Sequence, residues 1–403
     1  MKHTVNKFMK KYDVLIVGGG PVGGYIAGRL AEKKYSVAIF EKNKEIGMPL
    51  NCAGLVTPRV FDLLNIPKKN IIQNEIKGAN IHGPSGKTLT IGGDRLHAYV
   101  IDRTTFDKNI IRYSCEKGAE LYLNNKVISV KKNNNFSIIK TSKSIFSKCK
   151  LIIGADGPKS KIRKSFKFPE PKEFLNGIGA ELKNTSLDSR FVEIFIGNNI
   201  APGFFAWIIP TNKEGTMARA GLCVNSNSNI SPKYYFDKFY KYKLTYPFLK
   251  NSKIIRKIGG IVPVGVLKKI YDSNIMLVGD AAAQVKPTSG GGIYTGILCA
   301  TNCSEIAIQS LKENDFSAQQ LKKYQKLCSK EIGKEFFLGM RFRNIFKNLS
   351  DEKLDKLIVK FDNPQIIKTI NKYGDIDYPS KLAKQLIKKI PTLLKLLPYT
   401  IKK

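Results

Sequence analysis

A glycine-rich run and an acidic residue near the start of the chain have the spacing of a nucleotide site. Gly18-Gly19-Gly20-Pro21-Val22-Gly23 has the pattern G-x-G-x-x-G, and Glu41 follows 18 residues after its last glycine. In such a run the first glycine allows a tight turn, the second lets the backbone approach a pyrophosphate, and the third lets a helix pack on a strand. The acid can accept hydrogen bonds from an adenosine ribose. We therefore predict ligand contacts at Gly18, Gly20, Val22, Gly23 and Glu41.

A second acid and a second glycine run lie late in the chain. Asp280 follows the stretch 274–279, and Gly290-Gly291-Gly292-Ile293 begins ten residues after it. A carboxylate in this place can bind the ribitol hydroxyls of a flavin, and the glycines can bring backbone N–H groups against the flavin ring. The first run occurs in both NAD and FAD sites, and the second pair of features favours FAD. We predict further cofactor contacts at Asp280, Gly291, Gly292 and Ile293.

One thiol, Cys52, follows Glu41 by eleven residues, and two interpretations of it stay open. A thiol, whose ordinary pKa is about 8.5, stays mostly protonated at neutral pH and can donate a proton. Taken alone, however, a single cysteine is more often a small buried residue. The three His residues show no metal-ligand spacing, so we expect no metal site.

These chemical groups stand at the junctions of predicted strands and helices. The run 18–23 lies between a strand at 12–17 and a helix at 21–34, and Glu41 follows a strand at 36–40. Arg103 opens a helix after a strand at 98–101. Asp156-Gly157 forms a turn between a strand that begins at Lys150 and a helix start, and the second glycine run opens a helix from 293 to 311.

Four elements follow one another: the first glycine run, the helix start at Arg103, the turn at Asp156-Gly157, and Asp280 with the second glycine run. In this order they resemble the FAD-dependent hydroxylase-type flavoproteins over residues 10–310. The resemblance implies an α/β fold in which a Rossmann-like FAD-binding domain carries an inserted antiparallel-sheet substrate domain. It also implies that Arg103 and Asp156 contact the cofactor. A strand at 126–130 would supply a backbone contact to adenine, for which Val127 is the candidate.

Two segments resemble the geranylgeranyl reductase family within that superfamily. The first is the loop Cys52-Ala53-Gly54, which in the family lies beside the flavin ring. The second is 202–210, where the family has Tyr-x-Trp-x-Phe-Pro lining an isoprenoid pocket and this chain has Phe205, Trp207, Ile209 and Pro210. A strand here would place Phe204, Ala206 and Ile208 on one face and Phe205, Trp207 and Ile209 on the other. The chain departs from the family at Phe205, Ile209 and Gly54, where Tyr, Phe and Glu are usual, which leaves the precise substrate open.

The composition bounds the partners. The 403 residues are 42% hydrophobic and 25% charged, as in globular proteins, and no apolar run of 18 residues occurs. The net charge of +36 is spread along the chain and comes from 57 Lys against 11 Arg. This argues against nucleic acid and for attraction to an anionic membrane surface. Residues 381–403 contain seven Lys interleaved with Leu, so an interfacial helix and a solvated capping helix both stay open.

The resemblance implies an FAD-dependent reductase that saturates the C=C bonds of geranylgeranyl chains on an archaeal-type glycerophospholipid precursor. Cys52 would position or relay a proton, and the electron donor would be reduced ferredoxin, a deazaflavin or NADPH. The alternatives are a monooxygenase or halogenase of the same fold, or a membrane-associated electron-transfer flavoprotein. Scattered cysteines suggest a reducing cytoplasm, with the protein peripheral to the membrane. The expected division is an FAD-binding domain at 1–75, 96–165 and 270–311, a substrate domain at 76–95 and 166–269, and a C-terminal helical region at 312–403.

Overall fold

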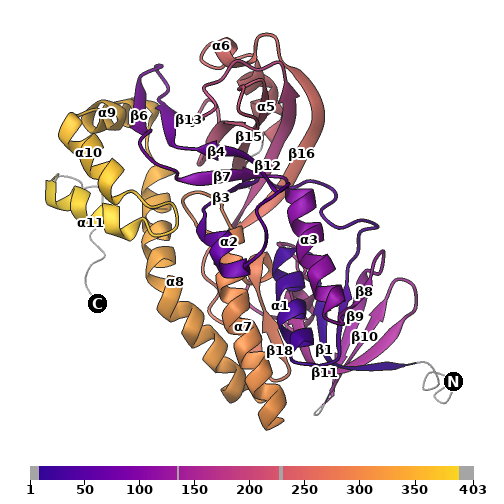
Figure 1. The fold of residues 1–403 in the computed structure, drawn as a ribbon. Coiled ribbons are helices and arrows are strands. Elements are labelled where there is room, and N and C mark those ends of the chain that lie inside the picture. The colour runs from indigo at the N-terminus through magenta and orange to yellow at the C-terminus, as the bar shows by residue number, and fades with distance from the viewer. Residues whose placement is uncertain (1–8, 134–135, 227–229, 390–403) are drawn as a thin grey trace.

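Three β-sheets organise the part of the chain that the structure, a computed structural model, describes: residues 9–133, 136–226 and 230–389 (Figure 1). The first sheet is mainly parallel at its centre, where β1 pairs with β2 and β11, and β11 pairs with β18. Its strands in spatial order are β17 (Tyr271–Asp272), β18 (Ile275–Leu277), β11 (Phe146–Gly154), β1 (Lys10–Val17), β2 (Val37–Phe40) and β8 (Glu120–Tyr122), with β10 (Ser137–Thr141) joined to β11 and β9 (Val127–Lys132) joined to β10.

Helices α1 (Pro21–Glu32), α3 (Arg103–Glu116) and α7 (Ile293–Glu313) pack together beside this sheet. In α1 the apolar side chains of Ile26 and Leu30 are fully buried, as their spacing predicts. The predicted strand–helix–strand unit around residue 20 is therefore confirmed. The helix ends two residues before its predicted end, because Lys34 has a left-handed backbone conformation with φ +64°.

The second sheet is antiparallel apart from one parallel pair, β13 with β5. Its back face packs on α5 (Pro232–Tyr240) and α6 (Tyr246–Leu249) through a core that includes Ile208 and Phe239. Strands that precede β11 in the sequence and strands that follow it meet in this second sheet. The division into domains stays a prediction. The strands in order are β16 (Lys253–Val264), β12 (Glu173–Lys183), β15 (Met217–Asn225), β14 (Phe205–Pro210), β13 (Phe191–Ile196), β5 (Gly78–His82) and β6 (Thr88–Gly92).

A small third sheet carries the chain between the two large ones. It consists of β3 (Leu55–Val56), β7 (Ala98–Ile101) and β4 (Ile72–Ile76), and the short helix α2 (Arg59–Leu64) follows β3. The strand predicted at 98–101 thus belongs to this sheet and not to the parallel one. Its carboxyl end still places Arg103 at the start of α3, which Asp102 caps through the N–H groups of Thr104 and Thr105.

The end of the described chain is helical, as predicted for the region that begins at residue 312. The long helix α8 (Ala318–Phe346) runs from the first sheet to the second (Figure 1). Near its start Tyr324 donates a hydrogen bond to the carbonyl of Leu277, and near its end Met340 packs against Leu175 of β12. Three shorter helices follow: α9 (Asp351–Phe361), α10 (Pro364–Tyr373) and α11 (Ser380–Lys389).

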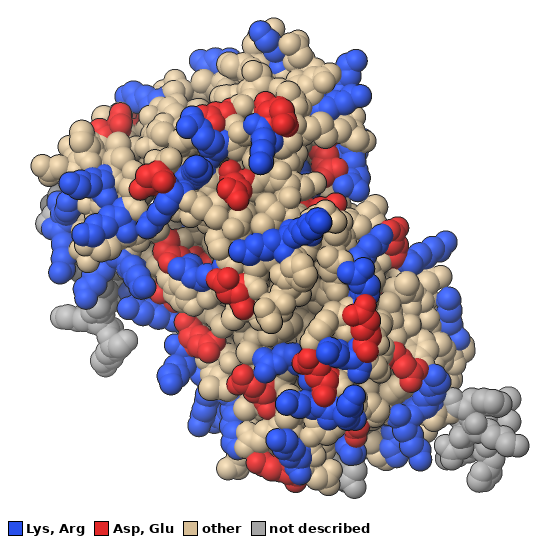
Figure 2. Space-filling model, in the orientation of Figure 1, with Lys and Arg blue, Asp and Glu red and all other residues tan. Residues whose placement is uncertain are grey.

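Positive side chains are dispersed over the face of the molecule that Figure 2 shows. On the face shown in Figure 2, lysines and arginines cover both halves of the molecule and acidic side chains lie among them. This agrees with the diffuse charge expected from the sequence. Within residues 9–389, apart from the short undescribed gaps, no helix combines the length and apolar character that a membrane span requires.

Candidate functional site

The glycine turn after β1 has the geometry that its spacing predicts. Gly18 has φ +111°, and a Cβ added there would lie 2.2 Å from the carbonyl oxygen of Ala155. A Cβ on Gly23 would lie 2.1 Å from the oxygen of Gly18. A Cβ on Gly20, in contrast, would have no atom of the described residues within 4 Å. The first and third glycines are thus required by packing, whereas Gly20 borders open space that a ligand can fill.

Glu41 is buried and holds this turn. Its Oε2 accepts a hydrogen bond from Gly19 N at 2.8 Å, and its Oε1 accepts one from Asn43 N at 2.8 Å. A carboxylate has about four lone-pair positions, so each oxygen can still accept a ribose hydroxyl. Val127 begins β9 close by, because Asn125 N donates to the backbone oxygen of Glu41 at 2.8 Å. That Glu41 binds ribose and Val127 adenine stays a prediction.

Asp280 supplies a partly buried carboxylate just after β18. It lies in the 3-10 turn η2 (Gly279–Ala282), and among the described residues no group donates a hydrogen bond to its side chain. Burial raises the pKa of Asp280 to about 6, although the nearby Arg103 charge opposes the shift. Leaving a carboxylate desolvated and unpaired costs free energy. Hydroxyl donors from a bound ligand would remove that cost.

The second glycine run faces the same carboxylate. A Cβ on Gly292 would lie 3.1 Å from Oδ1 of Asp280, so glycine keeps the backbone close to it. Val22 of α1 packs against Gly279 and Gly296, which joins the two glycine turns. The N-cap residues of helices α1 and α7 are Gly20 and Gly292, and neither supplies a side chain to the first N–H groups of its helix. Two helix N-termini therefore offer N–H groups and positive potential to an anion or a polar ring.

Asp156 has a structural task that its motif did not reveal. Its carboxylate accepts hydrogen bonds from the hydroxyl of Ser160 and the N–H groups of Lys161 and Ile162, and so caps α4 (Lys161–Ser165). Burial raises the pKa of Asp156 above the ordinary value. The next residue, Gly157, has φ +78° and open space on its Cβ side. Direct contact of Asp156 with a cofactor stays a prediction.

The loop that carries Cys52 lies beside these groups. The Cys52 thiol is half-exposed and accepts a hydrogen bond from Gly54 N at 3.3 Å. It lies next to Arg103, whose guanidinium binds both carboxylate oxygens of Asp107. Burial lowers the pKa of Arg103, but the attraction of Asp107 and of the Cys52 sulfur is larger and raises this pKa above its ordinary value. The charge of Arg103 also lowers the pKa of Asp280. The fold therefore brings the predicted residues Cys52, Arg103 and Asp280 together.

A buried arginine that the sequence analysis missed holds this loop in place. Arg219 of β15 donates from Nη1 to the carbonyl oxygens of Ala53 and Ile101, at 3.0 and 2.9 Å. Its Nε binds Glu181, which also binds Arg256. Gly54 has φ +75°, and a Cβ there would lie 2.4 Å from Nη1 of Arg219. The only available signal was the scarcity of Arg in a Lys-rich chain.

The predicted substrate residues lie on β14, with one correction. Phe205 and Trp207 are half-buried on one face, ring centroids 6.0 Å apart, and Ala206 and Ile208 point into the opposite core. The prediction was wrong for Phe204, which precedes the strand and stacks on Phe205 at 4.3 Å. The face therefore gains a second phenylalanine.

The end of β14 is enclosed by protein. Ile209 and Pro210 are both buried, and the Pro210 carbonyl accepts a hydrogen bond from Asn74. These two residues close one end of the face on which Phe205 and Trp207 are half-exposed. Their contact with substrate stays a prediction.

Glycines form the floor beside Trp207. Trp207 pairs with Gly221, Gly221 with Gly179, and Gly177 with Gly260, so four glycines share one sheet face with the indole. The indole lies against Gly221, because a Cβ there would lie 2.8 Å from its Cζ2. A Cβ on Gly260 would lie 3.0 Å from the oxygen of Asn51. The Cys52 loop therefore covers the glycine end of the same apolar face.

Comparison with known proteins places this chain in a family. The chain matches the model of the FAD binding domain over residues 11–332. It is 30% identical to the digeranylgeranylglycerophospholipid reductase of Methanocaldococcus jannaschii, across 95% of this chain and 97% of that protein. The chain belongs to the geranylgeranyl reductase family of FAD-binding proteins.

Solved structures agree with this membership. A geranylgeranyl bacteriochlorophyll reductase-like protein from Thermoplasma acidophilum is 26% identical, with a TM-score of 0.85 over 96% of this chain and 98% of that one. A halogenase in complex with FAD has a TM-score of 0.70 over 97% and 93% of the chains, and its 13% identity shows the fold alone. Geranylgeranyl reductase family members of this kind are FAD-dependent oxidoreductases, and FAD is the cofactor of this chain. The unpartnered Asp280 and the open side of Gly20 fit it.

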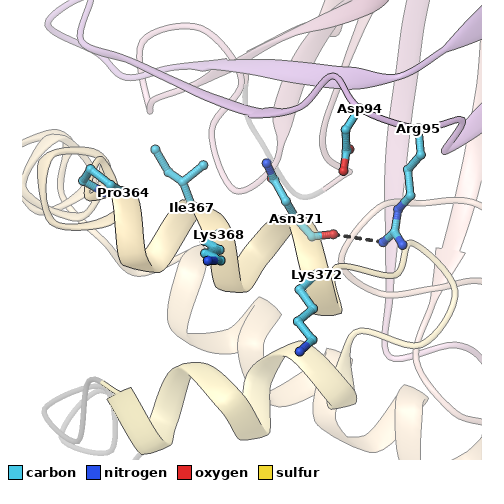
Figure 3. Close-up of a pocket in the computed structure, with 7 residues that line it drawn as sticks. All are labelled: Asp94, Arg95, Pro364, Ile367, Lys368, Asn371 and Lys372. Carbon is cyan, nitrogen blue, oxygen red and sulfur yellow. Dashed lines mark hydrogen bonds between the residues drawn. The ribbon is translucent and has the colours of Figure 1, made fainter.

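A surface pocket of about 740 Å³ shares no residue with the predicted cofactor and substrate sites (Figure 3). It lies between α10 and the loop before β7, where Arg95 donates a hydrogen bond to the carbonyl oxygen of Asn371 at 2.9 Å. Three of its side chains are cationic and one is acidic. The lining consists of Asp94, Arg95, Pro364, Ile367, Lys368, Asn371 and Lys372.

Proposed function

We propose that this chain saturates the C=C bonds of geranylgeranyl chains on an archaeal-type glycerophospholipid precursor. One observation carries the proposal: the Cys52 loop lies between the polar cofactor residues and the apolar face of the second sheet. Arg103 and Asp280 lie on one side of this loop. Gly260 and the side chains of Phe205 and Trp207 lie on the other. The name of the 30%-identical relative supports the same substrate class.

The residues present suit the reduction of an isolated alkene. Bound FAD, once reduced, supplies a hydride to one alkene carbon. The other carbon must receive a proton, and the Cys52 thiol, on the loop between Arg103 and the apolar face, can give one. An apolar face formed by Phe205, Trp207 and the glycine floor holds the isoprenoid and excludes water, which would otherwise add to the alkene as it gains cationic character.

A single-turnover experiment without oxygen tests this function. The purified holoenzyme is reduced with dithionite, which replaces the unknown donor, whether ferredoxin, a deazaflavin or NADPH. It is then mixed with a geranylgeranyl-chain glycerophospholipid, and we expect the lipid mass to rise by two hydrogens per double bond. A product formed only with oxygen would indicate a monooxygenase or halogenase. Transfer to a quinone with unchanged lipid would indicate an electron carrier.

We also propose that α10 and α11 rest on an anionic membrane surface. The described part of α11 has no buried residue, and it carries Lys381, Lys384, Lys388 and Lys389 beside half-exposed leucines. On α10, Lys368 and Lys372 are exposed at the pocket of Figure 3. The predicted interfacial segment continues from residue 390 outside the described residues. This proposal places the enzyme peripherally on the cytoplasmic side of the membrane.

Lys368→Gln with Lys372→Gln should weaken sedimentation with vesicles that contain anionic lipid. Each lysine near such a surface contributes about 1 kcal/mol, so the double variant should bind roughly 30-fold less tightly. Lys241→Gln with Lys243→Gln, two exposed lysines after α5, is the matched control. Equal losses in both double variants would mean that binding follows net charge and not the α10 surface.

A further inference from the structure

Lys286 is the one buried lysine among the described residues, in a chain that has 57. Its backbone forms hydrogen bonds to Gly290 and Gly291, and its side chain runs beneath the same turn. A Cβ on Gly291 would lie 3.0 Å from Cε and 3.4 Å from Nζ of Lys286. The ammonium is therefore fixed against the glycine run that begins α7.

The counter-charge comes from a distant part of the chain. Nζ of Lys286 donates to Oδ1 of Asp377 at 2.7 Å, and the Asp377 side chain is fully buried. Oδ2 of Asp377 accepts from the Thr57 hydroxyl at 2.6 Å and from Arg59 at 3.2 Å. Arg59 in turn binds both oxygens of Asp375.

The cluster of Lys286, Arg59, Asp375 and Asp377 is neutral as a whole, but it is ordered. Lys286 is the member that touches the glycine run. Asp375 accepts hydrogen bonds from the N–H groups of Asp377 and Tyr378, which fixes the acidic segment. A buried charge pair held this rigidly has a defined direction, and its field acts in surroundings of low dielectric.

We propose that Lys286 raises the reduction potential of bound FAD and that Asp377 limits this effect. Reduction by two electrons and one proton leaves one additional negative charge on the cofactor. A fixed ammonium beneath the glycine run stabilises that charge, and the paired carboxylate weakens the stabilisation. The inference rests on FAD binding at the glycine run and not on the identity of the lipid.

The competing explanation is that the pair only holds the glycine turn in shape. In that case removing either partner disturbs the same turn and shifts the potential in the same direction, or not at all. An electrostatic role requires shifts of opposite sign. This difference makes the two explanations separable in protein that still binds FAD fully.

The test compares Lys286→Met and Asp377→Asn by anaerobic titration with dithionite in the presence of a redox dye, without lipid. We expect Lys286→Met to lower the ratio of reduced to oxidised FAD about tenfold at a given potential, and Asp377→Asn to raise it about tenfold. For a two-electron couple each shift is about 30 mV. Lys233→Met and Asp237→Asn, which break an exposed pair on α5, should leave the potential unchanged.

Asp377→Asn leaves a buried ammonium unpaired, so it can fail to fold. The double variant Lys286→Met with Asp377→Asn then replaces it and should have a higher potential than Lys286→Met alone. Shifts of the same sign in both single variants would overturn the proposal. So would equal potentials in Lys286→Met and the double variant. Because no lipid is present, neither result bears on alkene reduction.

Discussion

Cys52→Ala is expected to slow alkene saturation by about 10²–10⁴, the range for the loss of one general acid, while FAD stays bound. The thiol lies next to Arg103, on the loop whose Asn51 covers the glycine floor of the apolar face. The rate is measured without oxygen as the return of oxidised-flavin absorbance when unsaturated lipid is added to the reduced enzyme.

Two further variants separate the roles open to this thiol. Cys115→Ala removes an exposed thiol on α3 and should leave the rate unchanged. Cys52→Ser should not restore activity, because a hydroxyl is a far weaker acid than a thiol. If Cys52→Ala and Cys52→Ser both reoxidise at nearly the wild-type rate, the residue only packs beside the cofactor and another group or water supplies the proton.

Asp280→Ala should weaken FAD binding by about 10- to 150-fold, which corresponds to 1.5–3 kcal/mol for hydrogen bonds to a charged group. The expectation follows from the lack of any donor to this carboxylate among the described residues. Titration of the apoprotein with FAD, followed by flavin fluorescence, gives the affinity. Asp237→Ala, at an exposed position on α5, is the control and should bind as the wild type does.

The pH dependence gives a second check on Asp280. Burial raises its pKa from 3.8 to about 6, so the empty folded protein holds a proton between these values that the unfolded chain has lost. This group therefore lowers the stability of the apoprotein as pH rises from about 4 to 6. Ribitol hydroxyls donate to the ionised form, so FAD affinity should increase as pH rises through about 6. Asp280→Asn should remove this increase, and an identical pH profile in that variant would contradict the assignment.

The parts of the site that were predictable from sequence depend on local spacing. Gly18, Gly23 and Asp280 stand at fixed offsets from the ends of β1 and β18, and the structure places them accordingly. Spacing did not reveal what each polar atom binds. Asp156 fits its motif, yet its carboxylate caps α4. Phe204 was assigned to the wrong face because alternation begins only where β14 begins, one residue later.

The contacts that hold the site together join residues far apart in the sequence. Arg219 reaches Ala53 across 166 positions, and Lys286 reaches Asp377 across 91. No periodic pattern encodes such pairs. Composition held one clue: of the 11 arginines, Arg163, Arg219 and Arg343 are almost fully buried and each serves several acceptors. A planar guanidinium presents five donors in fixed directions and suits this role better than the three donors of a lysine ammonium.

Helix α8 limits how the two large sheets can move. Its 29 residues give a rod about 43 Å long, and it is anchored to β18 through Tyr324 and to β12 through Met340 and the ion pair of Arg343 with Glu173. A hinge motion that separated the sheets would have to break at least one of these anchors or bend the helix. Under the proposed function, the distance between the bound flavin and the apolar face of the second sheet therefore stays constant. A polyprenyl chain with several double bonds would then have to slide past the flavin, so that each double bond is reduced in turn.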